Sequence, residues 1–154
     1  MSTRAVLERH PLLAHLPPER LARLAREGEV ETWKGGEDIV VEGSLGDALF
    51  LILSGDVAVH RGGQTFATLG GGEIFGEMSM VEPAPRSANV TAMSPTFLFR
   101  LPHDSLHRLL IDDPQTASAL LVQIVKTLSE RLRRANQRLS SVDQLADWLA
   151  GSLV

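Results

Sequence analysis

Short β-forming runs separated by glycines are the feature that most constrains the fold of this chain. Between residues 29 and 101, apolar and β-branched stretches alternate with turns that contain glycine. The clearest stretches are residues 39–41, 48–53, 57–59 and 96–101. Strands this short and this closely spaced favour a sandwich, barrel or jelly roll over β-α-β units. The pair Gly62-Gly63 also predicts a tight hairpin.

Helical patterns precede and follow this β-rich region. Residues 2 to about 27 predict two helices, because leucines recur at helical spacing and Pro17-Pro18 interrupts them. After the last strand, a helix is expected from Pro102 to about Asp112, followed by a long helix from about Gln115 to Leu139. The sequence therefore predicts a mainly β fold with flanking helices.

The long helix carries an apolar stripe that is close to a heptad seam. Its members are Ala117, Leu121, Ile124, Leu128, Leu132, Ala135 and Leu139. Such a stripe can pack on the β-region or form a symmetric dimer, and the sequence leaves both uses open. Beyond it, residues 141–144 are typical of a capping box, which predicts a separate last helix. The apolar residues of that helix are Leu145, Trp148, Leu149 and Leu153.

Composition excludes several classes of function. The chain has 154 residues and a formal net charge of −4, so its overall charge does not favour binding to nucleic acid or to an anionic membrane. It has no cysteine, which excludes disulfides, thiolate nucleophiles and zinc–thiolate sites. No run approaches the ~18 apolar residues of a membrane span, and the N-terminus lacks an apolar signal region. We therefore expect a cytoplasmic protein.

The stretch 75–90 contains the residues that point to a ligand. Gly76 precedes a short helical pattern, and backbone amides at such a place can face an anion. Arg86 adds a planar fork that matches phosphate oxygens. Glu77 offers only acceptors, which suits a ribose hydroxyl and opposes a second phosphate. Together these groups favour a nucleotide with one phosphate and a free ribose hydroxyl.

The spacing Phe75-Gly76-Glu77 followed by Pro85-Arg86-Ser87-Ala88-Asn89-Val90 resembles the phosphate-binding cassette of cyclic nucleotide-binding domains. These domains occur in catabolite activator proteins, protein kinase A regulatory subunits and cyclic nucleotide-gated channels. The resemblance covers residues 10 to 139 and implies an eight-stranded, jelly-roll-like β-roll with a 3′,5′-cyclic nucleotide as ligand. Together with the helical patterns on either side, this predicts N-terminal helices over 1–28, the β-roll over 29–101 with the cassette at 75–90, and lid and dimerisation helices over 102–139. The last amphipathic helix, over 140–154, is predicted from its own capping box and apolar residues.

The same resemblance assigns ligand-binding roles to individual residues. Arg86 is expected to bind the phosphate and Glu77 the ribose 2′-hydroxyl. Backbone amides are expected from Gly76 and Ala88, and a hydroxyl or amide from Ser87. Phe75 and Met78 complete the predicted ligand-binding set within the cassette. For Met78 and Met80, however, we favour packing of the short helix against the β-roll, because flexible methionines fill irregular gaps.

The resemblance also implies that the long helix covers the purine base, and Arg134 and Asn136 lie in the segment where family members bring polar residues over it. An asparagine can both donate and accept, which suits an adenine edge. The alternative is that the basic run is a solvated helix end. Ser87 does not decide between cyclic AMP and cyclic GMP, although we favour cyclic AMP. Ser79 departs from the small apolar residue expected two positions after the glutamate, which can alter affinity or base preference.

A metal-dependent, cupin-like enzyme is the alternative of a different class. His103 and His107 have helical i, i+4 spacing, but the sequence provides only Asp104 nearby as a third ligand. Cupin enzymes place several histidines on barrel strands, whereas only His60 lies in a predicted strand here. We therefore expect no catalytic residues, no metal and no cofactor. A degenerate module that binds a cyclic dinucleotide, or no nucleotide, is a further alternative.

The expected output is a movement of the C-terminal helices. Catabolite activator proteins carry a DNA-binding domain after the long helix, but only about fifteen residues follow Leu139 here. Direct DNA binding is therefore not expected, despite a basic patch of Arg131, Arg133, Arg134 and Arg138. We expect a non-enzymatic sensor that forms a homodimer through the long helix and signals to an unknown effector protein. The last helix can contact that effector or fold back onto the domain.

Overall fold

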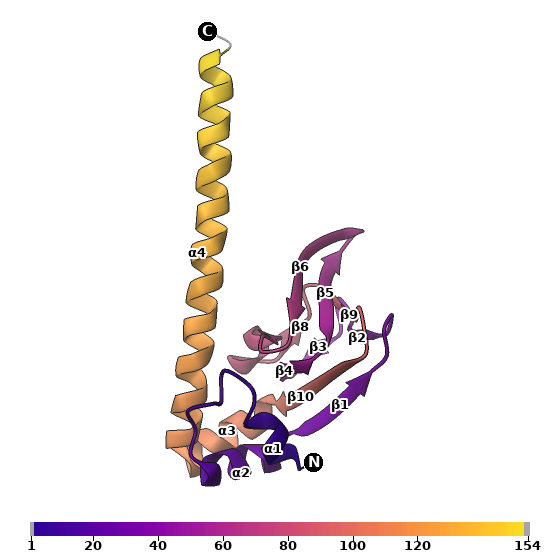
Figure 1. Ribbon diagram of the computed structural model, residues 1–154, viewed down its shortest axis with the longest axis vertical. Coiled ribbons are helices and arrows are strands. Elements are labelled where there is room, and N and C mark those ends of the chain that lie inside the picture. Colours follow the sequence, from indigo (N-terminus) through magenta and orange to yellow (C-terminus); the bar gives the residue numbers. More distant parts are fainter. Residues whose placement is uncertain (1, 153–154) are drawn as a thin grey trace. The chain divides into compact units, whose positions relative to one another are not determined.

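The computed structural model describes residues 2–152, apart from the side chains of Trp148 and Ser152 (Figure 1). The chain divides into two compact units, one up to Leu120 and one from Leu121 onward. The first contains two N-terminal helices, the strands and a third helix. Its helices are α1 (Thr3–Leu7), α2 (Pro18–Glu27), the 3-10 helix η1 (Glu77–Met80) and α3 (His103–Asp112), and α4 (Pro114–Ser152) begins in it.

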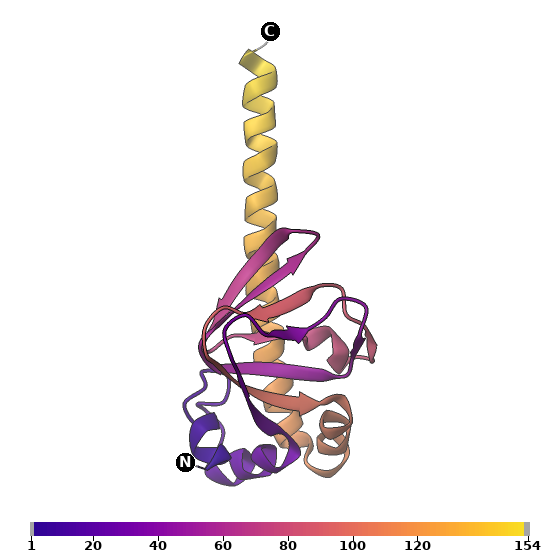
Figure 2. The ribbon, with the colours of Figure 1, turned by 90° about the vertical axis from the view of Figure 1, so that its right-hand side faces the viewer.

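Two four-stranded antiparallel sheets form the β-roll (Figure 2). One has the order β1-β10-β4-β7 and the other β2-β9-β5-β6, while β3 and β8 make a separate two-residue pair. The strands are β1 (Glu29–Trp33), β2 (Asp38–Val40), β3 (Leu45–Gly46), β4 (Ala48–Ser54), β5 (Asp56–Arg61), β6 (Gln64–Gly70), β7 (Ile74–Phe75), β8 (Ala84–Pro85), β9 (Asn89–Ala92) and β10 (Thr96–Pro102). The predicted eight-stranded β-roll with flanking helices is confirmed.

The hairpin predicted at Gly62-Gly63 joins β5 to β6. Both glycines have positive φ angles, 58° and 79°, which is the backbone that a two-residue turn between twisted strands requires. Asp56 pairs with Gly70 at one end of the ladder and Arg61 with Gln64 at the turn, with a register shift after Val59.

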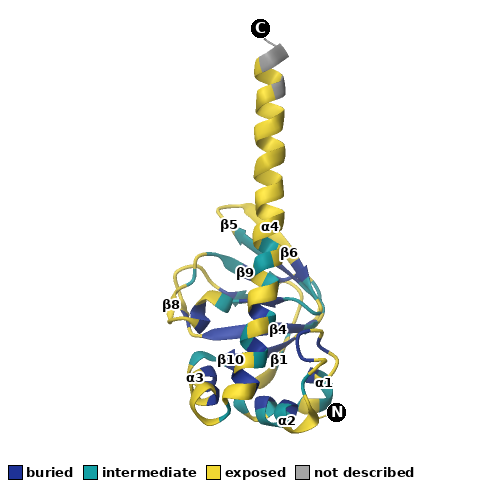
Figure 3. Cartoon of the chain, turned by 90° about the vertical axis from the view of Figure 1, so that its left-hand side faces the viewer, coloured by how far each residue is buried: buried dark blue, intermediate teal, exposed yellow. Residues whose placement is uncertain are grey.

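Alternation along β4 explains how the β-roll encloses its core (Figure 3). Ala48, Phe50 and Ile52 belong to one buried cluster with residues from both sheets. The other members are Val40, Val57, Leu69, Phe75, Val90 and Leu98. Leu49 and Leu51 point to the opposite face of the strand and are fully buried as well. A strand buried on both faces fits a sheet that is covered by helices on its second side.

The helices of the first unit supply that second layer. The leucines of α1, α2 and α3 that face inward are Leu7, Leu21, Leu24, Leu106 and Leu109, each at most 2% exposed. As predicted, α2 starts at Pro18, where its missing N–H and fixed φ are compatible with a first helical turn.

The predicted break near residue 140 is wrong, because α4 is one helix from Pro114 to Ser152. Ser141 does not cap a new helix. Its hydroxyl instead donates to the carbonyl oxygen of Gln137, one turn earlier, at 2.9 Å, which lets a serine occupy a helix interior. No glycine or proline lies between residues 115 and 150 to interrupt the helix. From residue 132 to 150 every described side chain is exposed. Leu153 and the side chain of Trp148 lie outside the described residues.

Candidate functional site

The cassette residues are placed by β7, η1 and the β8 strand that follows. Phe75 ends β7 and pairs with Phe50 of β4, and their rings stack with centroids 4.8 Å apart. Gly76 then turns the chain with a φ of 76° and caps η1. This left-handed conformation is easily reached only without a Cβ atom. Glu77, the first residue of η1, is partly exposed.

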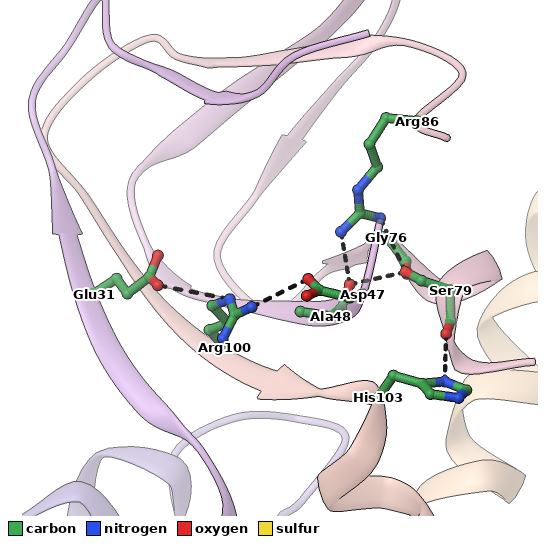
Figure 4. Close-up of polar contacts among 8 residues, drawn as sticks. All are labelled: Glu31, Asp47, Ala48, Gly76, Ser79, Arg86, Arg100 and His103. Carbon is green, nitrogen blue, oxygen red and sulfur yellow. Dashed lines mark hydrogen bonds and ion pairs between the residues drawn. The ribbon is translucent and has the colours of Figure 1, made fainter. Parts of the chain in front are cut away.

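Arg86 follows β8 and is half-buried beside the start of β4 (Figure 4). Its Nη2 donates to the carbonyl oxygen of Ala48 at 2.9 Å, and its Nη1 donates to the hydroxyl of Ser79 at 3.0 Å. The guanidinium also lies over the Phe50 ring, 5.8 Å from its centroid. These contacts use two of the five N–H groups of a guanidinium. The other three N–H groups are not used by either of these two hydrogen bonds.

Two glycines make room for this arginine. A Cβ atom on Gly46 would lie 2.7 Å from Nε and 2.8 Å from Cδ of Arg86. A Cβ on Gly76 would lie 2.9 Å from Nη1 and 2.9 Å from the Ala48 carbonyl oxygen. All four distances are too short for a real Cβ contact, so the guanidinium fits here only because these two positions lack side chains.

The charges around Arg86 are mixed. Burial lowers the pKa of Arg86, and the charge of Arg100 acts in the same direction, while the carboxylates of Asp47 and Glu77 raise it. Arg100 donates from Nη2 to Asp47 at 3.2 Å and has its Nε 3.9 Å from a carboxylate oxygen of Glu31. The site is thus a half-buried cation with carboxylates near it, which can accept an anion on one side and a hydroxyl donor on the other.

Ser79 has a role that sequence reasoning missed. Its side chain is 4% exposed. Its hydroxyl accepts from Arg86 and lies within hydrogen-bonding distance of two carbonyl oxygens, 2.6 Å from Gly76 and 3.0 Å from Ala48. The sequence shows only that a serine replaces the small apolar residue expected at this position. The hydrogen bonds of its hydroxyl could not be predicted, because Ala48 is distant in the chain and contributes only a backbone oxygen.

The remaining predicted cassette residues occupy different environments. Met80 is buried, as packing of the short helix requires, whereas the same prediction is wrong for Met78, which is 79% exposed. In a short 3-10 helix, neighbouring residues point to different sides, and Met78 is on the solvent side. Ser87 is exposed and its carbonyl oxygen accepts from Arg61 at 3.2 Å. Ala88 is half-buried.

Arg134 and Asn136 lie on α4, in the second unit, and both are exposed. Their predicted contact with a base therefore stays a prediction. His103 and His107 face each other on α3 with ring centroids 4.3 Å apart. The described residues contain no group of three or more histidine, aspartate or glutamate side chains that could hold a metal ion. Among these residues, no helix is both long and apolar enough to cross a membrane.

Comparison with known sequences identifies the family. A sequence model described as the cyclic nucleotide-binding domain matches residues 30–113, more than half of the chain. That range contains both sheets except Glu29, together with the cassette and α3. The chain therefore belongs to the cyclic nucleotide-binding domain family.

Individual proteins agree with this assignment. The CRP-like cAMP-activated global transcriptional regulator of Mycobacterium tuberculosis is 28% identical over 142 residues, which are 89% of this chain. The cyclic AMP receptor protein of Thermus thermophilus is 36% identical over 125 residues, which are 78% of this chain. The chain spans 62% and 58% of the length of these two relatives.

A solved structure shows the same fold. The crystal structure of a cyclic nucleotide-binding domain from Methylobacillus flagellatus matches with a TM-score of 0.76 and 30% sequence identity. The match covers 89% of this chain and 80% of that chain.

Proposed function

We propose that this protein is a non-enzymatic sensor of a 3′,5′-cyclic mononucleotide. In this proposal Arg86 binds the cyclic phosphate and Glu77 accepts a hydrogen bond from the ribose 2′-hydroxyl. The observation that carries it is the placement of Arg86. The guanidinium is held by two hydrogen bonds to its own chain and retains three N–H groups for an incoming anion.

The charges at the site support a ligand with one phosphate. Arg86 is partly desolvated, which strengthens its attraction for an anion. The carboxylates of Glu77 and Asp47 lie close enough to affect Arg86, so a second phosphate placed near them would be repelled. We therefore favour a mononucleotide over a cyclic dinucleotide. The backbone amides of Gly76 and Ala88 and the hydroxyl of Ser87 would complete the phosphate contacts.

We propose cyclic AMP rather than cyclic GMP as the ligand. The two curated relatives above are described as cAMP-activated and as a cyclic AMP receptor, and this chain shares their domain. Arg134 and Asn136 of α4 would cover the base when ligand is bound. Signalling would follow from a ligand affinity that differs between two arrangements of the C-terminal helices.

Isothermal titration calorimetry with cyclic AMP, cyclic GMP and cyclic di-GMP tests the proposal directly. We expect cyclic AMP to bind most tightly and Arg86→Ala to weaken that binding at least tenfold, since each charge-assisted hydrogen bond contributes about 1.5–3 kcal/mol. Arg26→Ala removes an equal charge from an exposed position of α2 and should bind like the parent. No heat from any of the three ligands, or wild-type affinity in Arg86→Ala, would contradict the proposal.

We also propose that the sensor is a homodimer formed through α4. Because the helix is continuous, apolar residues at heptad spacing extend along the whole second unit. The exposed members are Val125, Leu128, Leu132, Leu139, Val142 and Leu149. An exposed apolar stripe of this length is unusual on the surface of a protein in water. A second copy of α4 would bury it, while an effector protein would receive the signal elsewhere.

Sedimentation velocity of Leu132→Glu tests the dimer. A buried, unpaired carboxylate at the centre of the seam is costly, so we expect a shift from dimer to monomer. Gln137→Glu introduces the same charge at an exposed position off the stripe and should leave the parent's mass unchanged. A monomeric parent at micromolar concentration, or a dimeric Leu132→Glu, would disprove the proposed interface.

A further inference from the structure

The segment that follows α1 borders a pocket at the edge of the β-roll. The pocket has a volume of about 430 Å³, and small-molecule sites in proteins commonly have volumes of about 300–1,000 Å³. Its walls come from α1 and the residues just after it, from the end of β4, and from the turn between β6 and β7. These residues all belong to the first unit, and none of them lies in the cassette at 75–90. The pocket is therefore separate from the proposed nucleotide site.

A close approach between two segments shapes the pocket. Gly72 has a φ of 91°, and a Cβ atom on it would lie 3.1 Å from Cγ and 3.3 Å from Cδ of Pro11. A larger residue would be strained here and would press on the proline, whereas glycine lets the turn between β6 and β7 lie against the N-terminal segment. Both residues belong to the lining, so this contact forms part of the wall.

His10 is the buried polar residue of the lining, with an exposed fraction of 2%. Its Nδ1 accepts a hydrogen bond from the backbone N–H of Leu12 at 3.2 Å. Because Nδ1 accepts, the proton of the neutral ring must be on Nε2. Burial lowers the pKa of His10, against a smaller opposing effect from the Glu73 backbone, which favours this neutral form. His10 therefore presents one donor, its Nε2–H group.

This donor lacks an acceptor. Nε2 of His10 is buried and has no hydrogen-bond partner among the residues that the structure describes. The backbone of Glu73 is close enough to affect the pKa of His10, but its carbonyl oxygen bonds instead to the N–H of Ile52 at 2.9 Å. A buried donor without an acceptor is costly to the folded state. An acceptor atom that enters the pocket beside the ring would remove that cost.

The other polar groups of the lining favour an acceptor with a negative charge. Arg9 is exposed and is not a member of the ion pairs found in the described part of the chain. Ser54 adds a hydroxyl that can donate. No described aspartate or glutamate lines the pocket, and the nearby Glu73 carboxylate accepts from the N–H of Gly70 at 2.7 Å. The apolar part of the lining consists of Val6, Pro11 and Leu53.

We propose that this pocket binds a small organic acid, with its carboxylate beside Arg9 and His10 and its apolar body against the apolar part of the lining. The carboxylate accepts from Nε2–H of His10, and the guanidinium of Arg9 balances its charge. An inorganic anion would leave the apolar wall uncovered, and a neutral apolar molecule would leave the buried donor unpaired. This inference goes beyond the proposed function and does not depend on it.

Two carboxylates serve as probes, one aromatic and one branched aliphatic: benzoate and 3-methylbutanoate. Benzamide is the matched neutral control, because it keeps the ring and the carbonyl oxygen of benzoate but carries no charge. Each probe is titrated into the full chain while the backbone amide signals and the histidine ring nitrogen signals are followed by nuclear magnetic resonance. The shifts of the amide signals locate the probe, and their concentration dependence gives its dissociation constant.

Two variants and their controls assign the contacts. His10→Asn keeps an acceptor for the N–H of Leu12, since an asparagine oxygen can accept from the residue two positions on, but its side chain is too short to put a donor where Nε2 lies. His15→Asn is its control, at an exposed position outside the lining. Arg9→Gln removes the charge, and Arg4→Gln removes an equal charge from an exposed position of α1 that does not line the pocket. Thermal melts confirm that each variant folds.

We expect both carboxylates to shift the amide signals of residues 6–11, 53–54 and 71–72, and benzoate to bind more tightly than benzamide. The nitrogen shifts of His10 should be those of a neutral ring protonated at Nε2. His10→Asn should weaken benzoate binding about tenfold or more, because hydrogen bonds to charged groups are the stronger kind. Arg9→Gln should weaken it about two- to fivefold, as suits an exposed charge. His15→Asn and Arg4→Gln should bind like the parent.

Several results would overturn the inference. One is the absence of saturable binding by either carboxylate at millimolar concentration. Another is equal binding of benzoate and benzamide, which would remove the need for a charge. Shifts centred on residues 75–90 would place the acid at Arg86 instead. Parental affinity in His10→Asn would mean that the buried donor bonds only to water. If His10→Asn does not fold, Arg9→Gln decides, and parental affinity in that variant likewise overturns the inference.

Discussion

Replacing Gly46 by alanine tests whether the shape of the site, rather than the presence of Arg86 alone, sets ligand affinity. The added Cβ would lie 2.7 Å from Nε and 2.8 Å from Cδ of Arg86, and 2.9 Å from the carbonyl oxygen of Ala84. Gly46 is not among the residues with positive φ, so an alanine there meets no backbone strain. The substitution therefore acts through contact with the arginine and with β8.

The size of the effect follows from the hydrogen bonds that would be disturbed. To escape the clash, the arginine must move by several tenths of an ångström, which lengthens its bonds to Ala48 and Ser79 from 2.9 and 3.0 Å. Overpacking of this kind costs about 1–3 kcal/mol of folding free energy. Loss of one charge-assisted hydrogen bond to a phosphate corresponds to about 10- to 100-fold weaker binding of cyclic AMP.

A double-mutant cycle distinguishes this mechanism from a general loss of stability. Gly46→Ala should destabilise the parent more than it destabilises Arg86→Ala, because truncation of the arginine removes two of the three short contacts. It should also leave the already weak binding of Arg86→Ala unchanged. Gly35→Ala is the control, since its nearest contacts would be 3.5 Å and ordinary. Urea denaturation and calorimetry provide both readouts. Parental stability and affinity in Gly46→Ala, or strictly additive effects, would refute the reasoning.

Two further predictions concern pH. Burial lowers the pKa of His10, against a smaller opposing effect from the Glu73 backbone, so the unfolded chain takes up a proton near pH 6.5 while the folded chain resists it. The free energy of unfolding should fall as the pH drops below about 6.5. Denaturation curves at pH 7 and pH 5 measure this fall, which should be smaller in His10→Asn than in the parent. An equal fall in the two proteins would contradict this prediction. Hydrogen bonds from Thr116, with a smaller contribution from Arg20, hold the pKa of Asp113 below its usual value. The associated stability should be present above about pH 3.9 and lost as the pH falls through the lowered pKa. As the pH is lowered, the melting temperature of Asp113→Asn should decrease less than that of the parent. An equal decrease in both proteins would show that the carboxylate charge of Asp113 contributes nothing to stability.

Local patterns in the sequence predicted the elements of the fold well. Glycine-separated β runs indicated an antiparallel β-roll, and the sheets formed by β4, β10 and their neighbours follow those runs. The hairpin at Gly62-Gly63 was predictable because its turn type requires two residues with positive φ. The capping pattern at residues 141–144 led to the wrong prediction of a separate last helix. The same residues are tolerated inside a helix when no residue nearby interrupts it. Short motifs report local preference, and a strong continuous helix overrides them.

In the candidate site, too, some features can be predicted from the sequence and others appear only in the folded structure. The sequence by itself determined that Gly76, Glu77 and Arg86 belong together, because they lie in one short segment whose spacing is specific. Only the tertiary structure decided what surrounds Arg86. Gly46 and Ala48 come from a distant part of the chain, and Ala48 contributes a carbonyl oxygen that any residue type would provide. Backbone acceptors and missing side chains carry no chemical signature in a sequence, so their role becomes visible only when folding brings them next to a cation.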